Sequence, residues 1–240
     1  MKSLTLHISR FNPESDAHSH IQKIENIICN PIDTVLDVLL KVKDNIDSSL
    51  AFRYSCKCTI CGSCGMRINQ KAMLACETRI CDVEMDGVVR IEPLENFTVI
   101  KDLVVDIEPV INRLQLIVPW MLRDHKIPLP EKEFIIKPDE KNSIAEKLDR
   151  CNLCCVCHSD CETVETDKSF VGPISMAKAL KLILDPRDSI AEARLRQLVA
   201  LGLLKHPDEC KALCPKNIDI TKDIIIPLKK KAALKGLNFS

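Results

Sequence analysis

Residues 151–161 read Cys-Asn-Leu-Cys-Cys-Val-Cys-His-Ser-Asp-Cys, and four of these cysteines follow the spacing C-x2-C-x2-C-x3-C. In that pattern three thiolates on one curling loop bind three corners of an iron–sulfur cube, and the fourth ligates a different cluster. The remaining corner must come from a distant cysteine, and the chain offers Cys214, which is followed by Pro215. The alternative is a zinc site, but one zinc ion takes four ligands in paired knuckles and would leave a thiolate of this motif superfluous.

A second cysteine loop lies earlier in the chain, between residues 55 and 76. Its spacing is C-x4-C-x2-C with one further cysteine downstream, which is the plant-type [2Fe–2S] pattern. Gly62 and Gly65 lack a Cβ, so the backbone can turn tightly and direct N–H groups at the cluster sulfurs. A four-cysteine zinc site is again the alternative. The predicted ligands are Cys56, Cys61, Cys64 and Cys76.

The 14 cysteines are the most unusual feature of the composition. Residues 1–13 contain no apolar signal-peptide core, so we expect a cytoplasmic chain whose thiols are metal ligands rather than disulfides. Acidic and basic residues number 34 each and aromatic residues make up only 3%, which argues against nucleic-acid binding. No apolar run is long enough to span a membrane, so attachment to its inner face would require a partner subunit.

The first part of the chain has the pattern of a small mixed sheet. Alternating apolar residues at 4–11 predict a strand, and isoleucines within 21–28 predict a second. A helix capped by Asp33 or Thr34 should follow, and Asp86-Gly87 signals a hairpin after Val83. Two strands, a helix and a cysteine loop are the opening order of a β-grasp ferredoxin. We therefore predict an α+β protein with a plant-type [2Fe–2S] domain over residues 1–106.

The remainder, residues 107–240, is predicted to be an all-α domain similar to bacterial ferredoxins in its cluster loop. A proline-rich connecting segment is expected at residues 125–143. Apolar periodicity predicts one helix after Pro173, which ends near Asp185, and another after a cap at Ser189.

The chain resembles the iron–sulfur subunit of succinate dehydrogenase and fumarate reductase almost from end to end. The segments that carry the resemblance are residues 55–65, 74–76, 100–106, 119–120, 151–161, 170–173, 185–188 and 214–216. The resemblance implies a [2Fe–2S] cluster on the first cysteine loop, next to an FAD-containing flavoprotein subunit. It also implies a [4Fe–4S] cluster on the second loop and a third centre, usually [3Fe–4S], beside a quinone site. The implied [4Fe–4S] ligands are Cys151, Cys154, Cys157 and Cys214.

The third centre is where the chain departs from the family. Two of its three cysteines are present, as Cys161 and Cys210, but Leu204 stands where the family has the other. The proline and the quinone-site aromatic residues that the family places after Cys161 are also missing. Two thiolates leave an iron without a protein ligand, so we expect this cluster to be absent rather than rescued by His206 or Cys155.

The resemblance implies an electron-transfer subunit that relays single electrons between the flavoprotein and a second redox subunit or membrane anchor. No set of residues for substrate chemistry stands out, so the chemistry belongs to partners' cofactors. One alternative is the same relay in a thiol/disulfide-linked fumarate reductase or a heterodisulfide-reductase-like complex. Another is a zinc-stabilised interaction protein. Three further cysteines, Cys29, Cys58 and Cys81, are interpreted as non-ligands.

Overall fold

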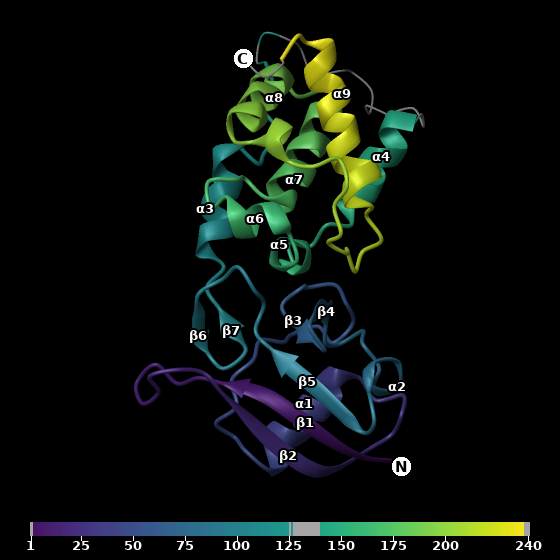
Figure 1. Ribbon diagram of the computed structural model, residues 1–240. Coiled ribbons are helices and arrows are strands. Elements are labelled where there is room, and N and C mark those ends of the chain that lie inside the picture. The colour runs from purple at the N-terminus through teal and green to yellow at the C-terminus, as the bar shows by residue number, and fades with distance from the viewer. Residues whose placement is uncertain (1, 125, 127–139, 238–240) are drawn as a thin grey trace. The chain divides into compact units, whose positions relative to one another are not determined.

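The computed structural model describes residues 2–124, 126 and 140–237 and divides into two compact units (Figure 1). The first, called the sheet unit below, comprises Met1–Ile107 and Asn152–Asp160. The second, the helical unit, comprises Glu108–Cys151 and Cys161–Ser240. The first boundary falls beside the predicted one at Asp106. Residues 152–160, which the sequence placed in the second domain, belong instead to the sheet unit.

The sheet unit is built on a mixed five-stranded sheet with the strand order β2-β1-β5-β3-β4. Strand β1 pairs antiparallel with β2 and parallel with β5, and β3 pairs antiparallel with both β4 and β5. A separate two-stranded sheet pairs β6 with β7. The strands are β1 (Lys2–Arg10), β2 (His20–Cys29), β3 (Gly65–Ile68), β4 (Lys71–Leu74), β5 (Val88–Glu92), β6 (Val99–Lys101) and β7 (Val104–Val105).

Local sequence explains the first elements of this unit. The alternation in β1 buries Leu4, Leu6 and Ile8, which lie at most 1% exposed. Helix α1 (Val35–Asn45) begins at Thr34, whose hydroxyl accepts from the Asp37 N–H at 3.1 Å while the Asp37 carboxylate accepts from the Thr34 N–H at 3.0 Å. This reciprocal capping box satisfies two backbone donors at once, so the predicted cap at Thr34 is confirmed.

The predicted hairpin at Asp86-Gly87 was only partly right. Both residues adopt left-handed backbone, with φ of +50° and +77°, and Met85 and Val88 exchange backbone hydrogen bonds across the turn. Val83, however, ends the short helix α2 (Ile80–Val83) and is not in a strand. The Ile80 N–H donates to the Asp33 carbonyl, and this hydrogen bond anchors the start of α2. The turn at Asp86-Gly87 therefore follows a helix and not a strand.

Residues 152–160 include the short helix α5 (Val156–Ser159) and are held to the sheet unit by polar contacts. The Asp160 carboxylate accepts from the Arg67 guanidinium at 3.0 Å and from the Ala72 N–H at 3.1 Å. The Ser159 hydroxyl accepts from the Glu95 N–H at 2.9 Å. The second cysteine loop therefore rests on strands β3 and β4 and on the segment that follows β5.

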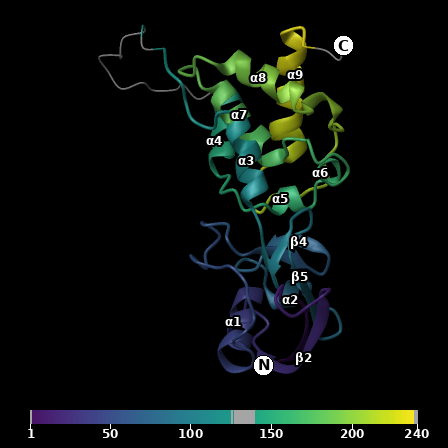
Figure 2. The same cartoon turned by 90° about the vertical axis from the view of Figure 1, so that its left-hand side faces the viewer.

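Within the helical unit, α7 (Pro173–Leu184) packs against α3, α4 and α8, as Figures 1 and 2 show. No strand occurs among the residues described in this unit. The predicted connecting segment 125–143 lies outside the described residues, apart from Lys126 and the backbone of the first turn of α4. The other elements are α3 (Glu108–Leu116), α4 (Glu140–Asp149), α6 (Glu162–Thr166), α8 (Ala191–Ala200), η1 (Leu203–Lys205), the π-helix η2 (Ile220–Ile225) and α9 (Ile226–Leu234).

The helix predicted after Pro173 is confirmed, but the predicted cap at Ser189 is wrong. Helix α8 starts at Ala191, after Ile190, and has no side-chain cap. The Ser189 hydroxyl and N–H both donate to the Leu122 carbonyl at 2.8 Å, so this residue fastens the segment before α4 instead.

A buried arginine holds α8 to the end of α3. Both nitrogens of one edge of the Arg194 guanidinium donate to Asp188, at 2.9 and 3.0 Å, and the side chains are 1% and 0% exposed. The same guanidinium also donates to three backbone carbonyls, those of Ile117, Val118 and Trp120. Each of the three guanidinium nitrogens therefore has a carboxylate or carbonyl partner.

Replacing Arg194 by leucine should lower the free energy of unfolding by about 3–5 kcal/mol, because it leaves the buried Asp188 carboxylate without its opposite charge. Arg196→Leu is the matched control on the same helix. Its ion pair with Glu192 is 57% and 46% exposed, so a change within roughly 0.5 kcal/mol is expected. Urea unfolding of the two variants measures the difference. Equal losses would contradict this role for Arg194.

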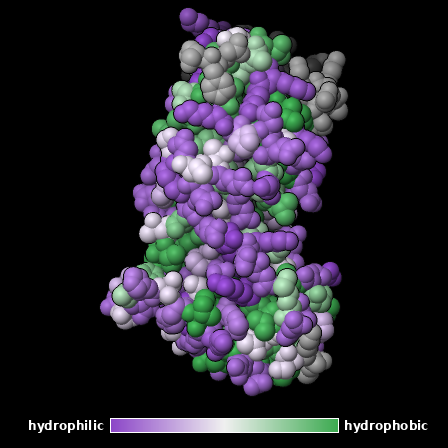
Figure 3. Space-filling view, in the orientation of Figure 1, coloured by the Kyte–Doolittle hydropathy of each residue, from purple (hydrophilic) through white to green (hydrophobic). Residues whose placement is uncertain are grey.

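Among the residues that the structure describes, every helix is too short or too polar to traverse a lipid bilayer. The face drawn in Figure 3 is largely hydrophilic, with hydrophobic residues exposed in small groups.

Candidate metal centres

All fourteen cysteines lie within the described residues, and none of them forms a disulfide bond. In the loop at residues 56–64, the N–H groups of Cys58 and Cys61 donate to the Cys56 sulfur at 3.4 and 3.3 Å. The Thr59 N–H donates to the Cys76 sulfur at 3.3 Å. Left-handed backbone at Lys57 and Thr59 produces these inward N–H groups, and such concavities favour negatively charged ligands.

The four predicted [2Fe–2S] ligands lie in two environments. Backbone N–H donors from Cys61 and Cys58, followed by the Cys61 side chain, lower the pKa of Cys56 to about 6. Its thiolate is therefore present at neutral pH and ready to bind a metal. Burial raises the pKa of Cys64 to about 12, with the neighbouring Cys76 side chain adding to the effect. Binding of a metal at Cys64 must displace a proton.

The structure also places Cys58 close to this set. A hydrogen bond with the Cys56 side chain is the largest cause that raises the pKa of Cys58. Cys58 is exposed. Cys81 is likewise exposed, and Cys29 is buried at the end of strand β2. The assignment of all three as non-ligands stays a prediction.

Asn152 contributes to this loop, and sequence reasoning missed it. Its side-chain amide donates to the carbonyls of Thr59 and Ile60, both at 3.0 Å. Gly62 has φ of +70°, and a Cβ there would lie 2.9 Å from the Cys154 Cβ and 3.0 Å from its Cα. Gly62 is thus required both by its backbone conformation and by the close approach of the second cysteine loop.

Gly62→Ala should lower the free energy of unfolding by roughly 2–4 kcal/mol, because the added methyl group meets Cys154 and the residue must hold a left-handed conformation. Gly87→Ala separates the two effects. Gly87 has φ of +77°, but the nearest atom to its Cβ would be the Ser3 carbonyl oxygen at 3.9 Å. Only the backbone cost of about 1–2 kcal/mol is expected there. Denaturant unfolding of both variants compares them, and equal losses would rule out the clash.

The second cysteine loop also bends through left-handed residues, since φ is +59° at Leu153 and +65° at Cys155. Conformations of this kind in residues other than glycine cost energy and gather at functional sites. They agree with the curling loop expected from the C-x2-C-x2-C spacing. The Cys155 thiol donates to the Leu153 carbonyl at 3.4 Å.

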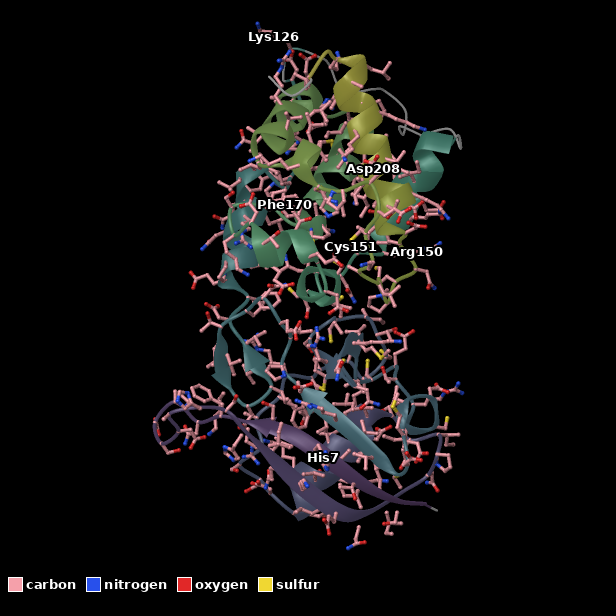
Figure 4. All side chains as sticks on the ribbon, viewed as in Figure 1. His7, Lys126, Arg150, Cys151, Phe170 and Asp208 are labelled. Atoms are coloured by element: carbon pink, nitrogen blue, oxygen red, sulfur yellow. The ribbon has the colours of Figure 1, made fainter. Side chains whose placement is uncertain are left out.

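The predicted [4Fe–4S] ligands are distributed over both units. Cys154 and Cys157 belong to the sheet unit, whereas Cys151, labelled in Figure 4, and Cys214 belong to the helical unit. Burial raises the pKa of Cys214, and the charge of Cys151 raises it further, which places these two thiols within electrostatic reach. The Lys216 N–H donates to the Cys214 sulfur at 3.4 Å.

The helical unit has a hollow of about 410 Å³ beside its last cysteines. Its lining combines sulfur with aliphatic groups and comprises Cys210, Ala212, Leu213, Cys214, Asn217, Ile218, Asp219 and Ile220. The two thiols are the soft ligands of this wall, and thiolates favour iron–sulfur clusters or zinc over magnesium or calcium.

Cys161 lies in the helical unit beside His206, with the sulfur 3.8 Å from the Nε2 atom. Hydrogen bonding from Cys210 is the first of the causes that lower the pKa of Cys161 to about 5, and His206 also contributes. The side chain with donor chemistry beside Cys161 is therefore His206. No three His, Cys, Asp or Glu side chains in the described ranges already surround an ion position.

The chain matches the family described as "2Fe-2S iron-sulfur cluster binding domain" over residues 5–112. It is 36% identical to the fumarate reductase iron-sulfur subunit of Mycobacterium tuberculosis, covering 91% of this chain and 89% of that one. It is 33% identical to the mitochondrial succinate dehydrogenase [ubiquinone] iron-sulfur subunit of Dictyostelium discoideum, covering 90% and 78%. A solved chain of the Mycobacterium smegmatis Sdh1 complex in the apo form matches with a TM-score of 0.84 and 25% identity, covering 98% of each chain.

Proposed function

The chain belongs to the family of iron–sulfur subunits of succinate dehydrogenase and fumarate reductase, and we propose that its cysteine loops hold the clusters that carry the electrons. It is the electron-transfer subunit of an oxidoreductase complex. The relatives give no support to a zinc-stabilised scaffold or to a non-quinone enzyme. One observation carries the assignment of the first centre: backbone N–H groups already donate to the sulfurs of Cys56 and Cys76.

We assign the [2Fe–2S] cluster to Cys56, Cys61, Cys64 and Cys76, and the [4Fe–4S] cluster to Cys151, Cys154, Cys157 and Cys214. When bound, such clusters supply one-electron carriers. The protein's part is to hold them and to set their environment. Cys64 and Cys76 are buried and exclude water on one side, and the backbone donors stabilise the negative charge of the thiolates.

The partner for the first centre is an FAD-containing flavoprotein subunit, which would cover the loop at residues 56–64. Support comes from the exposure of that loop: Cys61 is exposed, and Ile60 at its tip is 69% exposed. A large apolar side chain at an electron entry point is suited to burial against another chain. A second redox subunit or membrane anchor would receive the electrons and hold the chain at the inner face of the membrane.

Anaerobic purification of the native complex tests this function. We expect a brown preparation that contains a flavoprotein, and succinate should bleach its visible absorption as electrons enter the clusters. The reduced sample should give a [2Fe–2S] paramagnetic signal. A colourless protein with bound zinc would refute the cluster assignment. An iron-containing chain that never accompanies a flavoprotein would refute the partner.

A further inference from the structure

We infer that Cys161, His206 and Cys210 hold a third iron–sulfur centre, with the His206 imidazole in place of the cysteine that Leu204 replaces. This rests on the proposed function, because the centre would extend the same electron relay. The sequence favoured absence of the centre over rescue by His206 or Cys155. The contact between His206 and Cys161 now favours rescue by His206.

The first step in the argument is the tautomer of His206. Its Nδ1 atom lies 2.7 Å from the Pro207 carbonyl oxygen, which can only accept a hydrogen bond. Nδ1 therefore donates to this carbonyl, which leaves Nε2 as the ring nitrogen that can ligate iron. That is the nitrogen 3.8 Å from the Cys161 sulfur. A backbone carbonyl that fixes Nδ1–H is the usual outer support of a histidine that ligates a metal through Nε2.

The second step is that the ring is held in place. His206 is only 2% exposed, and its ring lies 5.2 Å from that of Phe170, labelled in Figure 4. The His206 carbonyl accepts from the Lys229 ammonium at 2.6 Å, and the same ammonium contacts the Asp208 carboxylate at 2.6 Å. Helix α9 thereby fastens the segment that carries the imidazole.

The third step is the donor set. Cys161 is 1% exposed, and the Cys210 N–H donates to the Thr221 hydroxyl at 3.0 Å, which fixes the second cysteine against η2. Cys210 also lines the 410 Å³ hollow of the helical unit. Imidazole replaces thiolate on iron in Rieske centres, so two thiolates and one imidazole form an acceptable set. The Cys161 sulfur and the His206 Nε2, now 3.8 Å apart, must separate to admit the cluster between them.

Wild-type protein in its native complex gives the first test. Iron analysis should find about nine atoms per chain, against about six if only the [2Fe–2S] and [4Fe–4S] centres are present. Pulsed paramagnetic resonance of protein labelled with 15N-histidine should detect nitrogen coupled to the third centre. Six iron atoms, a zinc ion at this site, or a third centre without nitrogen coupling would overturn the inference. If the first two centres were missing as well, the proposed function itself would fail.

Variants of His206 give the second test. His206→Ala should lose about three iron atoms per chain while the other two centres keep their signals. His206→Cys should retain the third centre, lose the nitrogen coupling and lower the reduction potential, because an anionic thiolate replaces a neutral ring. His20→Ala, at an exposed histidine of the sheet unit, should change none of these readouts. A third centre that survives unchanged in His206→Ala would exclude His206 as a ligand.

Discussion

Cys76→Ser should abolish the [2Fe–2S] signal and remove about two iron atoms per chain, and Cys61→Ser should do the same. Serine is a hard oxygen donor that binds iron of a sulfide cluster poorly compared with a soft thiolate. The Cys76→Ser substitution also removes the sulfur that accepts a hydrogen bond from the Thr59 N–H. Low-temperature paramagnetic resonance of the reduced protein and iron analysis measure the loss.

Two control variants accompany this experiment. Cys81→Ser changes an exposed thiol of the same unit, which donates to the Asp82 carboxylate at 3.5 Å. It should leave the signal intact. Cys58→Ser is the stricter control, because Cys58 lies beside Cys56 but falls outside the plant-type spacing. Loss of the signal in Cys58→Ser would show that the ligand assignment is wrong.

Cys214→Ala should destabilise the helical unit strongly, with a loss on the order of 5 kcal/mol or more in the free energy of unfolding of the cluster-loaded protein. A cluster binds only the folded chain, so removing a ligand removes folding free energy. Cys214 lies in the irregular chain that follows η1, and the proposed cluster is what would tie it to Cys151. Thermal and denaturant unfolding, monitored by helical circular dichroism, measure the effect.

The cluster-free proteins supply the control for this prediction. With iron removed, wild type and Cys214→Ala should unfold with similar free energies, because the lost stability comes from the cluster rather than from packing of the thiol. Leu213→Ala, at a neighbouring residue that is 64% exposed, should change stability by roughly 0.5 kcal/mol or less in either state. A Cys214→Ala protein with full iron content and unchanged stability would contradict the prediction.

Features with a local physical cause were predictable from the sequence. The capping box at Thr34 and the buried alternation of Leu4, Leu6 and Ile8 depend on residues within one turn or one strand. The spacing of Cys56 and Cys61 likewise encodes a loop whose N–H groups meet a sulfur. In each case the residues that make the contact lie close together in the chain.

Features that depend on distant partners were not predictable. Ser189 is a residue type that often caps helices, but its hydroxyl donates to the Leu122 carbonyl instead. Leu122 is distant in sequence, so no local pattern predicts this contact. His206 stands out of register with the missing cysteine, so spacing alone could not pair it with Cys161. Asn152 looked like a spacer within the cysteine motif, yet its amide binds the other cysteine loop.

The sheet unit is discontinuous in sequence, because Asn152–Asp160 completes it after the chain has passed through Glu108–Cys151. During synthesis the ribosome must add that intervening stretch before Asp160 can reach Arg67 and Ala72. At typical elongation rates this takes roughly 2–9 s. During that interval the nascent loop at residues 56–64 lacks the hydrogen bonds that the Asn152 amide makes to it in the folded protein. The contacts that Asn152 and Asp160 make with the rest of the sheet unit can therefore form only after translation has passed residue 160.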